Sequence, residues 1–274
     1  MILDKPQFQI LAWIAIPRTG TNFLCSLMYH HPLITSYYEI FHPQQFHAGY
    51  KSNTEGIIKY INQKYCFNFL NAEDTNLIQW IRNNPSELID ILVYFNPERH
   101  ISFKLFPDHL DKKMIESAII KNKNIKKILV KRDLLAAYIS HEIALKTNRW
   151  NNFDTSQIQI SLSVEKFEKW VNRAEQWYEF FESYHNIDKQ GYFVINYEDI
   201  HAHKTNLDKL KYLDNFLKNI GIEFPKEYQL PSENYIKILK KQDTRANIEE
   251  KIINYKEFVQ GIEDKSLSQY LPDK

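Results

Sequence analysis

Short apolar segments alternate with longer segments of helical periodicity along this chain of 274 residues, and this alternation restricts the fold more than any other feature. Apolar runs typical of buried strands lie at 8–16, 99–106 and 125–132, and a fourth begins at 191. Strands that alternate with helices in this way favour parallel β-α-β units. We therefore predict an α/β fold with a central parallel sheet flanked by helices.

The helical segments between these strands show apolar residues at the spacing of one helix face. They are expected at 21–30, between 55 and 84, and at 133–146, 163–184, 206–221 and 248–259. Gly221 is expected to end the fifth of them. No repeat and no glycine-rich linker divides the chain, so we expect a single domain over residues 1–274.

The charge of the chain is almost balanced. Lys and Arg total 35, Asp and Glu total 34, and the formal net charge is +1. Such a balance argues against a nucleic-acid partner or an anionic membrane surface, because both need a broad positive surface. The first residues are too polar for a signal peptide, and the first apolar run is far below the ~20 residues of a membrane span. We expect a cytoplasmic protein without integral membrane contact.

The polar turn between the first strand and the first helix is a candidate anion site. Backbone N–H groups at a helix N-terminus lack helical partners, and the helix dipole favours negative charge there. Arg18 adds a fixed charge, and Thr19, Thr21 and Asn22 carry side-chain donors. Gly20 lets the backbone approach an anion closely. A capped helix that binds nothing is the alternative for this turn alone.

This turn differs from the loop of nucleoside-triphosphate enzymes, which reads G-x-x-x-x-G-K-[ST]. The first glycine of that pattern is absent, and no Lys-Ser or Lys-Thr pair is present to hold a phosphate and Mg²⁺. The turn is therefore expected to bind an anion without a metal.

The letters PRTGTNFL, followed by HP and then YYEIFHP, resemble the start of sulfotransferases that use 3′-phosphoadenosine 5′-phosphosulfate (PAPS), especially the bacterial and carbohydrate-type branch. The resemblance runs from about Ile10 to Phe258, with specific motifs in three short segments. It implies a P-loop-like sulfotransferase fold and a cradle for the 5′-phosphosulfate, with Arg18 near the bridging oxygen. The cradle would consist of Arg18, Thr19, Gly20, Thr21, Asn22 and Phe23.

Arg132 and Ser140 form the second motif. Arg132 ends an apolar strand, and Ser140 follows eight positions later, roughly two helical turns and ~12 Å along a helix. The two side chains can therefore line one edge of a groove, and an arginine with a hydroxyl suits a phosphate monoester. The resemblance implies that both bind the 3′-phosphate of PAPS, and it extends through the letters AxxTNRW to Trp150. An ordinary surface arginine and an unrelated serine are the alternative.

A third segment near the C-terminus carries Lys240, Lys241 and Arg245 as a local basic cluster. The resemblance implies that Gln242, Thr244 and Arg245 close over the nucleotide. A solvated helix start capped by Thr244 is the alternative.

Transfer to an alcohol needs a base for the hydroxyl proton. Glu39 is the first candidate, because its aromatic and apolar neighbours would raise its pKa by burial, and the resemblance implies the same role. The alternative is that Glu39 only orients Arg18 through an ion pair. His42, which titrates near neutrality, is the second candidate. Lys104 is a charge in an apolar strand, so it either marks an edge strand or points into the site to stabilise the transferring group.

These expectations favour an enzyme that transfers a sulfuryl group from PAPS to a hydroxyl of an acceptor and leaves 3′,5′-ADP (PAP), without a metal. A carbohydrate or glycolipid is the first expectation for the acceptor, and a small alcohol stays open, as does a homodimer. A kinase-like P-loop phosphotransferase is the alternative enzyme, and it would need ATP and Mg²⁺. A non-catalytic nucleotide- or glycan-binding protein of the same fold is the third hypothesis.

Overall fold

The computed structural model describes residues 9–49, 53–150, 153–184, 191–239, 242–245 and 247–271. Within them, five strands form one sheet in the order β2-β3-β1-β4-β5, and every neighbouring pair is parallel. The strands are β1 (Ile10–Ile14), β2 (Ile34–Ser36), β3 (His100–Leu105), β4 (Ile125–Lys131) and β5 (Phe193–Asn196). The predicted α/β fold with a central parallel sheet is confirmed.

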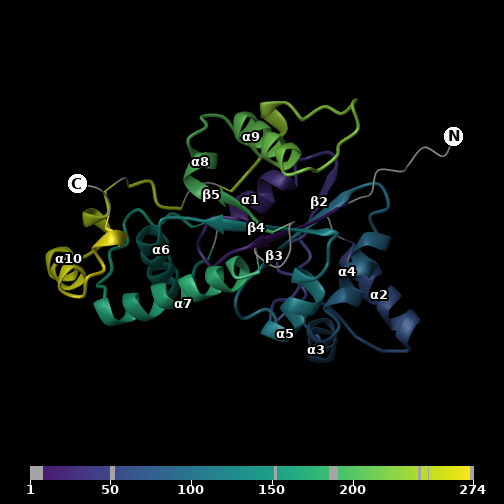
Figure 1. Ribbon diagram of the computed structural model, residues 1–274, viewed down its shortest axis with the longest axis horizontal. Coiled ribbons are helices and arrows are strands. Elements are labelled where there is room, and N and C mark those ends of the chain that lie inside the picture. Colours follow the sequence, from purple (N-terminus) through teal and green to yellow (C-terminus); the bar gives the residue numbers. More distant parts are fainter. Residues whose placement is uncertain are drawn as a thin grey trace.

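Helices cover both faces of this sheet, as Figure 1 shows: α1, α8 and α9 lie on one face, and α2, α3, α4 and α7 lie on the other. The helices are α1 (Thr21–Met28), α2 (Thr54–Tyr65), α3 (Thr75–Asn83), α4 (Pro85–Tyr94), α5 (Lys112–Met114), α6 (Leu134–Thr147), α7 (Val164–Glu182), α8 (Tyr197–His201), α9 (Asn206–Asn219) and α10 (Tyr255–Asp264). A π-helix spans Ile115–Ile120, and short 3-10 helices span Glu233–Tyr235, Glu249–Lys251 and Ser268–Tyr270.

The central strand β1 shows why its sequence is apolar throughout. Ile10, Ala12 and Ile14 pack towards α2, α3, α4 and α7, whereas Leu11 and Trp13 pack towards α1 and α9. Successive side chains of a strand point to opposite faces, and a parallel strand covered on both faces has no polar side. The run was therefore readable as a buried strand from the sequence alone.

A third apolar cluster joins α6, α7 and α10 beyond the end of the sheet. Tyr138 of α6, Phe167 of α7 and Phe258 of α10 are buried in it. A parallel bridge between Ile160 and Ile252 connects the segments that lead into α7 and α10. This cluster fixes the C-terminal segment next to α6, which carries part of the candidate site.

The boundaries differ from the predicted ones in three places. The strand expected from residue 191 onward ends at Asn196, because Tyr197 begins α8, whose first turn carries the acidic Glu198 and Asp199. The helix expected at 248–259 is instead a 3-10 turn followed by α10. Strand β2 and helix α4 were not predicted, although Pro85 at the first position of α4 is a recognised start signal.

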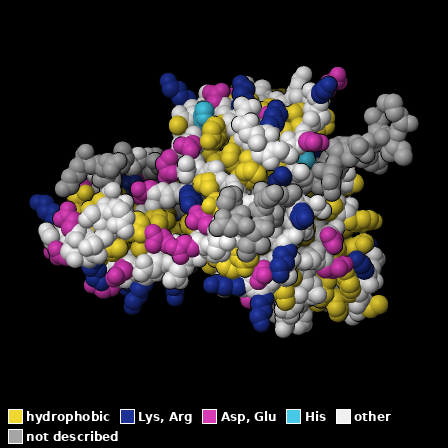
Figure 2. All heavy atoms as spheres, viewed as in Figure 1, with side chains coloured by type: hydrophobic (Ala, Val, Ile, Leu, Met, Phe, Trp, Pro, Cys, Tyr) yellow, Lys and Arg dark blue, Asp and Glu magenta, His cyan; other side chains and the backbone are white. Residues whose placement is uncertain are grey.

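Lys and Arg side chains are interspersed with Asp and Glu side chains over the face drawn in Figure 2, in keeping with the balanced composition. None of the helices in the described ranges combines the length and the hydrophobicity that a bilayer crossing requires.

Candidate functional site

The carboxyl ends of β1, β3 and β4 meet at one edge of the sheet. The chain leaves β1 for β2 on one side and later returns to β4 on the other, so the strand order reverses at β1. Ligands of open parallel sheets bind beyond the carboxyl ends of the strands at such a point. The turn Ala15–Gly20, which the sequence marked as an anion site, leaves β1 there.

This turn has an unusual backbone. Arg18 and Gly20 both adopt positive φ, 73° and 83° respectively. The hydroxyl of Thr19 donates to the carbonyl of Ile16 at 2.8 Å, and the Thr19 side chain is fully buried. Thr19 therefore fixes the turn, and in this conformation its hydroxyl proton is already used within the protein.

Glycine is required at position 20 because a neighbouring side chain leaves no room for a Cβ. A Cβ on Gly20 would lie 2.2 Å from two ring carbons of Tyr197, far inside contact distance. Tyr197 is the first residue of α8, so this close approach packs the turn against the end of β5. This contact gives Tyr197 a structural role.

The Arg18 guanidinium connects three segments that are distant in sequence. Its Nε donates to Ser140 Oγ at 3.0 Å, and its terminal nitrogens donate to the Trp150 carbonyl and to Gln242 Oε1. The predicted first turn, the predicted helix residue Ser140 and the predicted closing segment thus meet at one cation. All three partners are neutral oxygens.

Arg132 lies directly beside Arg18. Its Nη1 donates to the Arg18 carbonyl at 2.7 Å, and its guanidinium carbon lies 4.5 Å from the ring centre of Tyr197. Burial, together with the charge of Arg132, lowers the pKa of Arg18 to about 10. Within the described ranges no carboxylate forms an ion pair with either guanidinium. Two neighbouring cations without a counter-ion make a local positive site in a chain of almost zero net charge.

Three buried polar atoms around these arginines have no hydrogen-bond partner in the part of the chain that is described: Arg132 Nε, Gln242 Nε2 and His141 Nδ1. An unsatisfied buried polar group costs about 1–3 kcal/mol, so such atoms mark a place where a ligand would be stabilised. Burial, with the charge of Arg18 as a second cause, lowers the pKa of His141. His141 was not predicted, and its only sequence signal is its position next to Ser140.

The closing segment is held by its own contacts. The Arg245 guanidinium pairs with Asp243 and donates to the carbonyls of Thr155 and Ile158, and Thr244 Oγ1 lies 3.1 Å from Ser156 Oγ. In this structure Arg245 and Thr244 therefore secure the segment instead of presenting free groups to a nucleotide. Among the described residues of this segment, Gln242 is the one that bonds to Arg18, and Lys240 and Lys241 lie outside the described residues.

A second group of charges surrounds Glu39. Lys104 Nζ donates to Glu39 Oε1 at 2.8 Å and to Asn22 Oδ1 at 2.5 Å, and His109 Nε2 lies 3.5 Å from Glu39 Oε2. Lys104 is fully buried on β3, which lies between β2 and β1. The edge-strand reading of Lys104 is therefore wrong, and its ammonium lies against Glu39. Asn22 of α1 joins this group to the turn that carries Arg18.

The pKa of Glu39 differs from the expected direction. Burial raises it, but the hydrogen bond and charge of His109 and the pairing with Lys104 outweigh burial, and the net pKa lies well below its usual range. The expectation of a raised pKa is wrong, because it did not include these two partners. His109 follows the carboxyl end of β3, so strand-end position was the signal that could have indicated it.

His42 is less suited to accept a proton. Its Nδ1 accepts a hydrogen bond from the Gln44 N–H at 3.2 Å, which places the proton of the neutral ring on Nε2. Burial lowers its pKa, with smaller effects of Glu39 and other nearby charges. The lone pair of the neutral His42 ring is thus already used, whereas each carboxylate oxygen of Glu39 has further lone pairs beside its contact with Lys104 or His109.

Two cradle residues serve mainly the core through their side chains. Thr21 is buried at the first position of α1, and the Phe23 ring packs 4.3 Å from the ring of His201. Phe23, whose ring packs in the core, has only main-chain atoms to offer an anion. The described site thus combines Arg18, Arg132, Ser140 and Gln242 on one side with the Glu39 group on the other.

No protein-family model matches this chain, and no curated protein sequence gives a significant match. Among solved structures, it is similar to the sulfotransferase domain of the olefin synthase of Synechococcus PCC 7002, with 16% identity, 82% of this chain and 78% of that chain covered, and a TM-score of 0.48. It is also similar to a sulfotransferase domain from the curacin biosynthetic pathway, with 14% identity, 80% and 75% covered, and a TM-score of 0.47. At these values the function has to be argued from the residues of this chain.

Proposed function

We propose that this chain is a PAPS-dependent sulfotransferase that moves a sulfuryl group to a hydroxyl of an acceptor. The observation that carries the proposal is the pair Arg18 and Arg132, two adjacent guanidinium groups with no carboxylate partner in the described ranges. Their like charges repel each other until an anion lies between or beside them. A doubly phosphorylated nucleotide supplies such an anion at each end.

The residues present fit that group. Arg18 now donates to three neutral oxygens, and a phosphate oxygen is a stronger acceptor for a guanidinium. Arg132 Nε and Gln242 Nε2 are buried donors that a phosphate would satisfy. In this proposal Arg132 and Ser140 hold the 3′-phosphate, and Arg18 with the main chain of the turn holds the 5′-phosphosulfate.

PAPS would supply the sulfuryl group, and PAP would be the product that leaves. Glu39 receives the acceptor's hydroxyl proton on its carboxylate as the oxygen attacks sulfur. Lys104 connects the two halves of the site, because its ammonium bonds to Glu39 and to Asn22 in the first turn of α1. A shift of this ammonium towards the transferring group would raise the pKa of Glu39 at the moment when Glu39 must accept a proton.

A thermal-shift panel tests the binding half of the proposal. PAP should stabilise the protein by about 2.7 kcal/mol at a hundredfold excess over Kd, because it binds only the folded state. Arg132→Gln should reduce this shift, whereas Arg173→Gln, an exposed arginine of α7, should not. ATP with Mg²⁺ as the only stabilising ligand would overturn the proposal in favour of the phosphotransferase.

An assay with labelled PAPS distinguishes an enzyme from a binding protein. Transfer of label from PAPS to any hydroxyl acceptor supports the enzyme, and cytoplasmic carbohydrate sulfation is the first version to test. Tight PAP binding without transfer to any member of a broad acceptor panel would identify a non-catalytic nucleotide-binding protein.

A further inference from the structure

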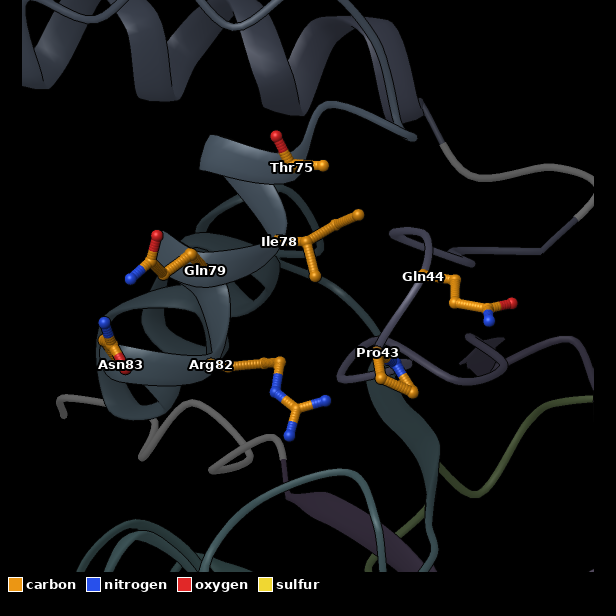
Figure 3. Close-up of a pocket in the computed structure, with 7 residues that line it drawn as sticks. All are labelled: Pro43, Gln44, Thr75, Ile78, Gln79, Arg82 and Asn83. Carbon is orange, nitrogen blue, oxygen red and sulfur yellow. The ribbon is translucent and has the colours of Figure 1, made fainter.

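A pocket of about 460 Å³ lies between helix α3 and the loop that follows Glu39 (Figure 3). Its size falls within the ~300–1,000 Å³ typical of small-molecule sites. Ile78 and Arg82 extend from α3 towards the loop that carries Pro43 and Gln44 (Figure 3). The lining consists of Pro43, Gln44, Thr75, Ile78, Gln79, Arg82 and Asn83.

The lining is mixed in a way that suits a hydroxylated ring. The amides of Gln44, Gln79 and Asn83 can both donate and accept hydrogen bonds, and they match hydroxyl groups. Pro43 and Ile78 offer apolar surface to the C–H side of a ring. No member of this lining takes part in the nucleotide site described above.

Arg82 is the one charged residue of the lining. It is half-buried, and across the described ranges it forms no ion pair and no side-chain hydrogen bond. Lys64 of the neighbouring helix α2, in contrast, is paired with Glu87 at 2.6 Å. A partly desolvated guanidinium without a partner is suited to bind an oxyanion in a bidentate manner.

The pocket is connected to the proposed base through a short piece of chain. The Gln44 N–H donates to His42 Nδ1 at 3.2 Å, and the His42 ring centre lies 6.2 Å from that of His109. His109 in turn faces Glu39 Oε2 at 3.5 Å. A molecule in the pocket would therefore lie beside the loop that carries the proton acceptor.

We infer that this pocket binds the acceptor and that the acceptor is an anionic sugar, a hydroxylated ring whose oxyanion contacts Arg82 beside the loop that follows Glu39. That the bound sugar is the acceptor rests on the proposed function. The preference of the pocket for an oxyanion is independent of that function, and it can be measured without a sulfuryl donor.

Saturation-transfer NMR with three probes tests this inference on the full chain: methyl β-D-glucuronide, D-glucose 6-sulfate and methyl β-D-glucoside. At least one anionic probe should bind more tightly than the neutral glucoside, and the stronger of the two identifies carboxylate or sulfate as the preferred group. Arg82→Gln should weaken that probe about tenfold, or about 1.4 kcal/mol. Arg82→Lys should restore part of the affinity, and Arg173→Gln should leave it unchanged.

Equal binding of all three probes to the wild-type chain, or unchanged affinity in Arg82→Gln, would overturn the inference. Arg82→Gln should keep the thermal shift by PAP, which shows that the variant is folded and that the nucleotide site is intact. If PAP fails to shift the wild-type chain while the anionic probe still depends on Arg82, the proposed function fails and the anion pocket stands.

Discussion

Glu39 lies between two groups that favour its charged form. Lys104 and His109 outweigh the effect of burial, so the pKa of Glu39 lies well below its usual range. The carboxylate is therefore already ionised in mildly acidic solution and can receive a proton. It stays a weak base as long as Lys104 is paired with it. This property distinguishes Glu39 from His42, whose pKa burial lowers from the ordinary histidine value.

Under the proposed function, Glu39→Gln should lower the turnover of sulfuryl transfer by a factor of about 10² to 10⁴, because the proposed general base is lost. Wild-type activity should not fall through Glu39 between pH 7 and pH 5, since its carboxylate stays ionised over that interval. Steady-state rates with PAPS over this range check both statements, and the PAP thermal shift checks folding. A steep fall below pH 6.5, together with an equal loss of turnover in His42→Gln, would assign the base to His42 instead.

Two glycines with the same φ allow the energetic cost of backbone strain to be measured separately from the cost of a steric clash. Gly20 and Gly221 both have φ +83°, but a Cβ on Gly20 would collide with Tyr197, whereas a Cβ on Gly221 has only Lys126 Nζ at 3.8 Å. Gly221→Ala should cost about 1–3 kcal/mol of unfolding free energy from φ alone. Gly20→Ala should cost more, and the excess should disappear when both variants are compared in a Tyr197→Ala background. Urea unfolding measures all four, and equal costs for the two glycines would contradict the contact.

At the scale of elements, Asp214 of α9 connects three segments. It is almost fully buried, and it accepts hydrogen bonds from His31 at the end of α1, from Lys218 one turn later and from Tyr228. These bonds outweigh the raising effect of burial and lower the pKa of Asp214 to about 2. The contacts hold α1, which begins in the candidate site, against α9 on the same face of the sheet.

Asp214→Asn should lower the unfolding free energy by about 2 kcal/mol at neutral pH, because the folded state binds a proton here less readily than the unfolded state. A lowered folded-state pKa gives stability above pH ~4 that is lost as the pH falls towards 2. The difference between wild type and variant should therefore shrink below pH ~4. Urea denaturation at several pH values measures it, and a difference that grows in acid would contradict the assignment.

At the scale of the whole molecule, the sequence contained most of the fold and about half of the site. The parallel sheet followed from alternation, and Gly221 ends α9 with positive φ as expected. Arg18, Ser140 and Gln242 come from three separate motifs, and the folded chain brings them into direct contact, which the motifs alone did not predict. The partner of each cation was not predictable, because Lys104 with Glu39 and Arg245 with Asp243 depend on side chains that only the folded chain brings together.

The pocket beside α3 shows the same limit. Arg82 and Gln44 lie 38 positions apart, and no local pattern relates them. Helix periodicity predicted helical structure between 55 and 84, but it gave no information on which loop would lie opposite. Sites formed between an inserted helix and a strand-end loop are thus visible only once tertiary structure is known.

The ladder between β1 and β4 pairs Ile14 with Leu129, four residues before Arg18 and three before Arg132. A slip of one residue would displace one arginine by about 3.3 Å along its strand and turn the β4 side chains to the opposite layer. The distance between Arg18 and Arg132 therefore depends on the main-chain pairing of β1 with β4 in the protein interior. Substitutions in the sheet interior that touch no ligand can consequently abolish recognition as completely as the loss of either guanidinium.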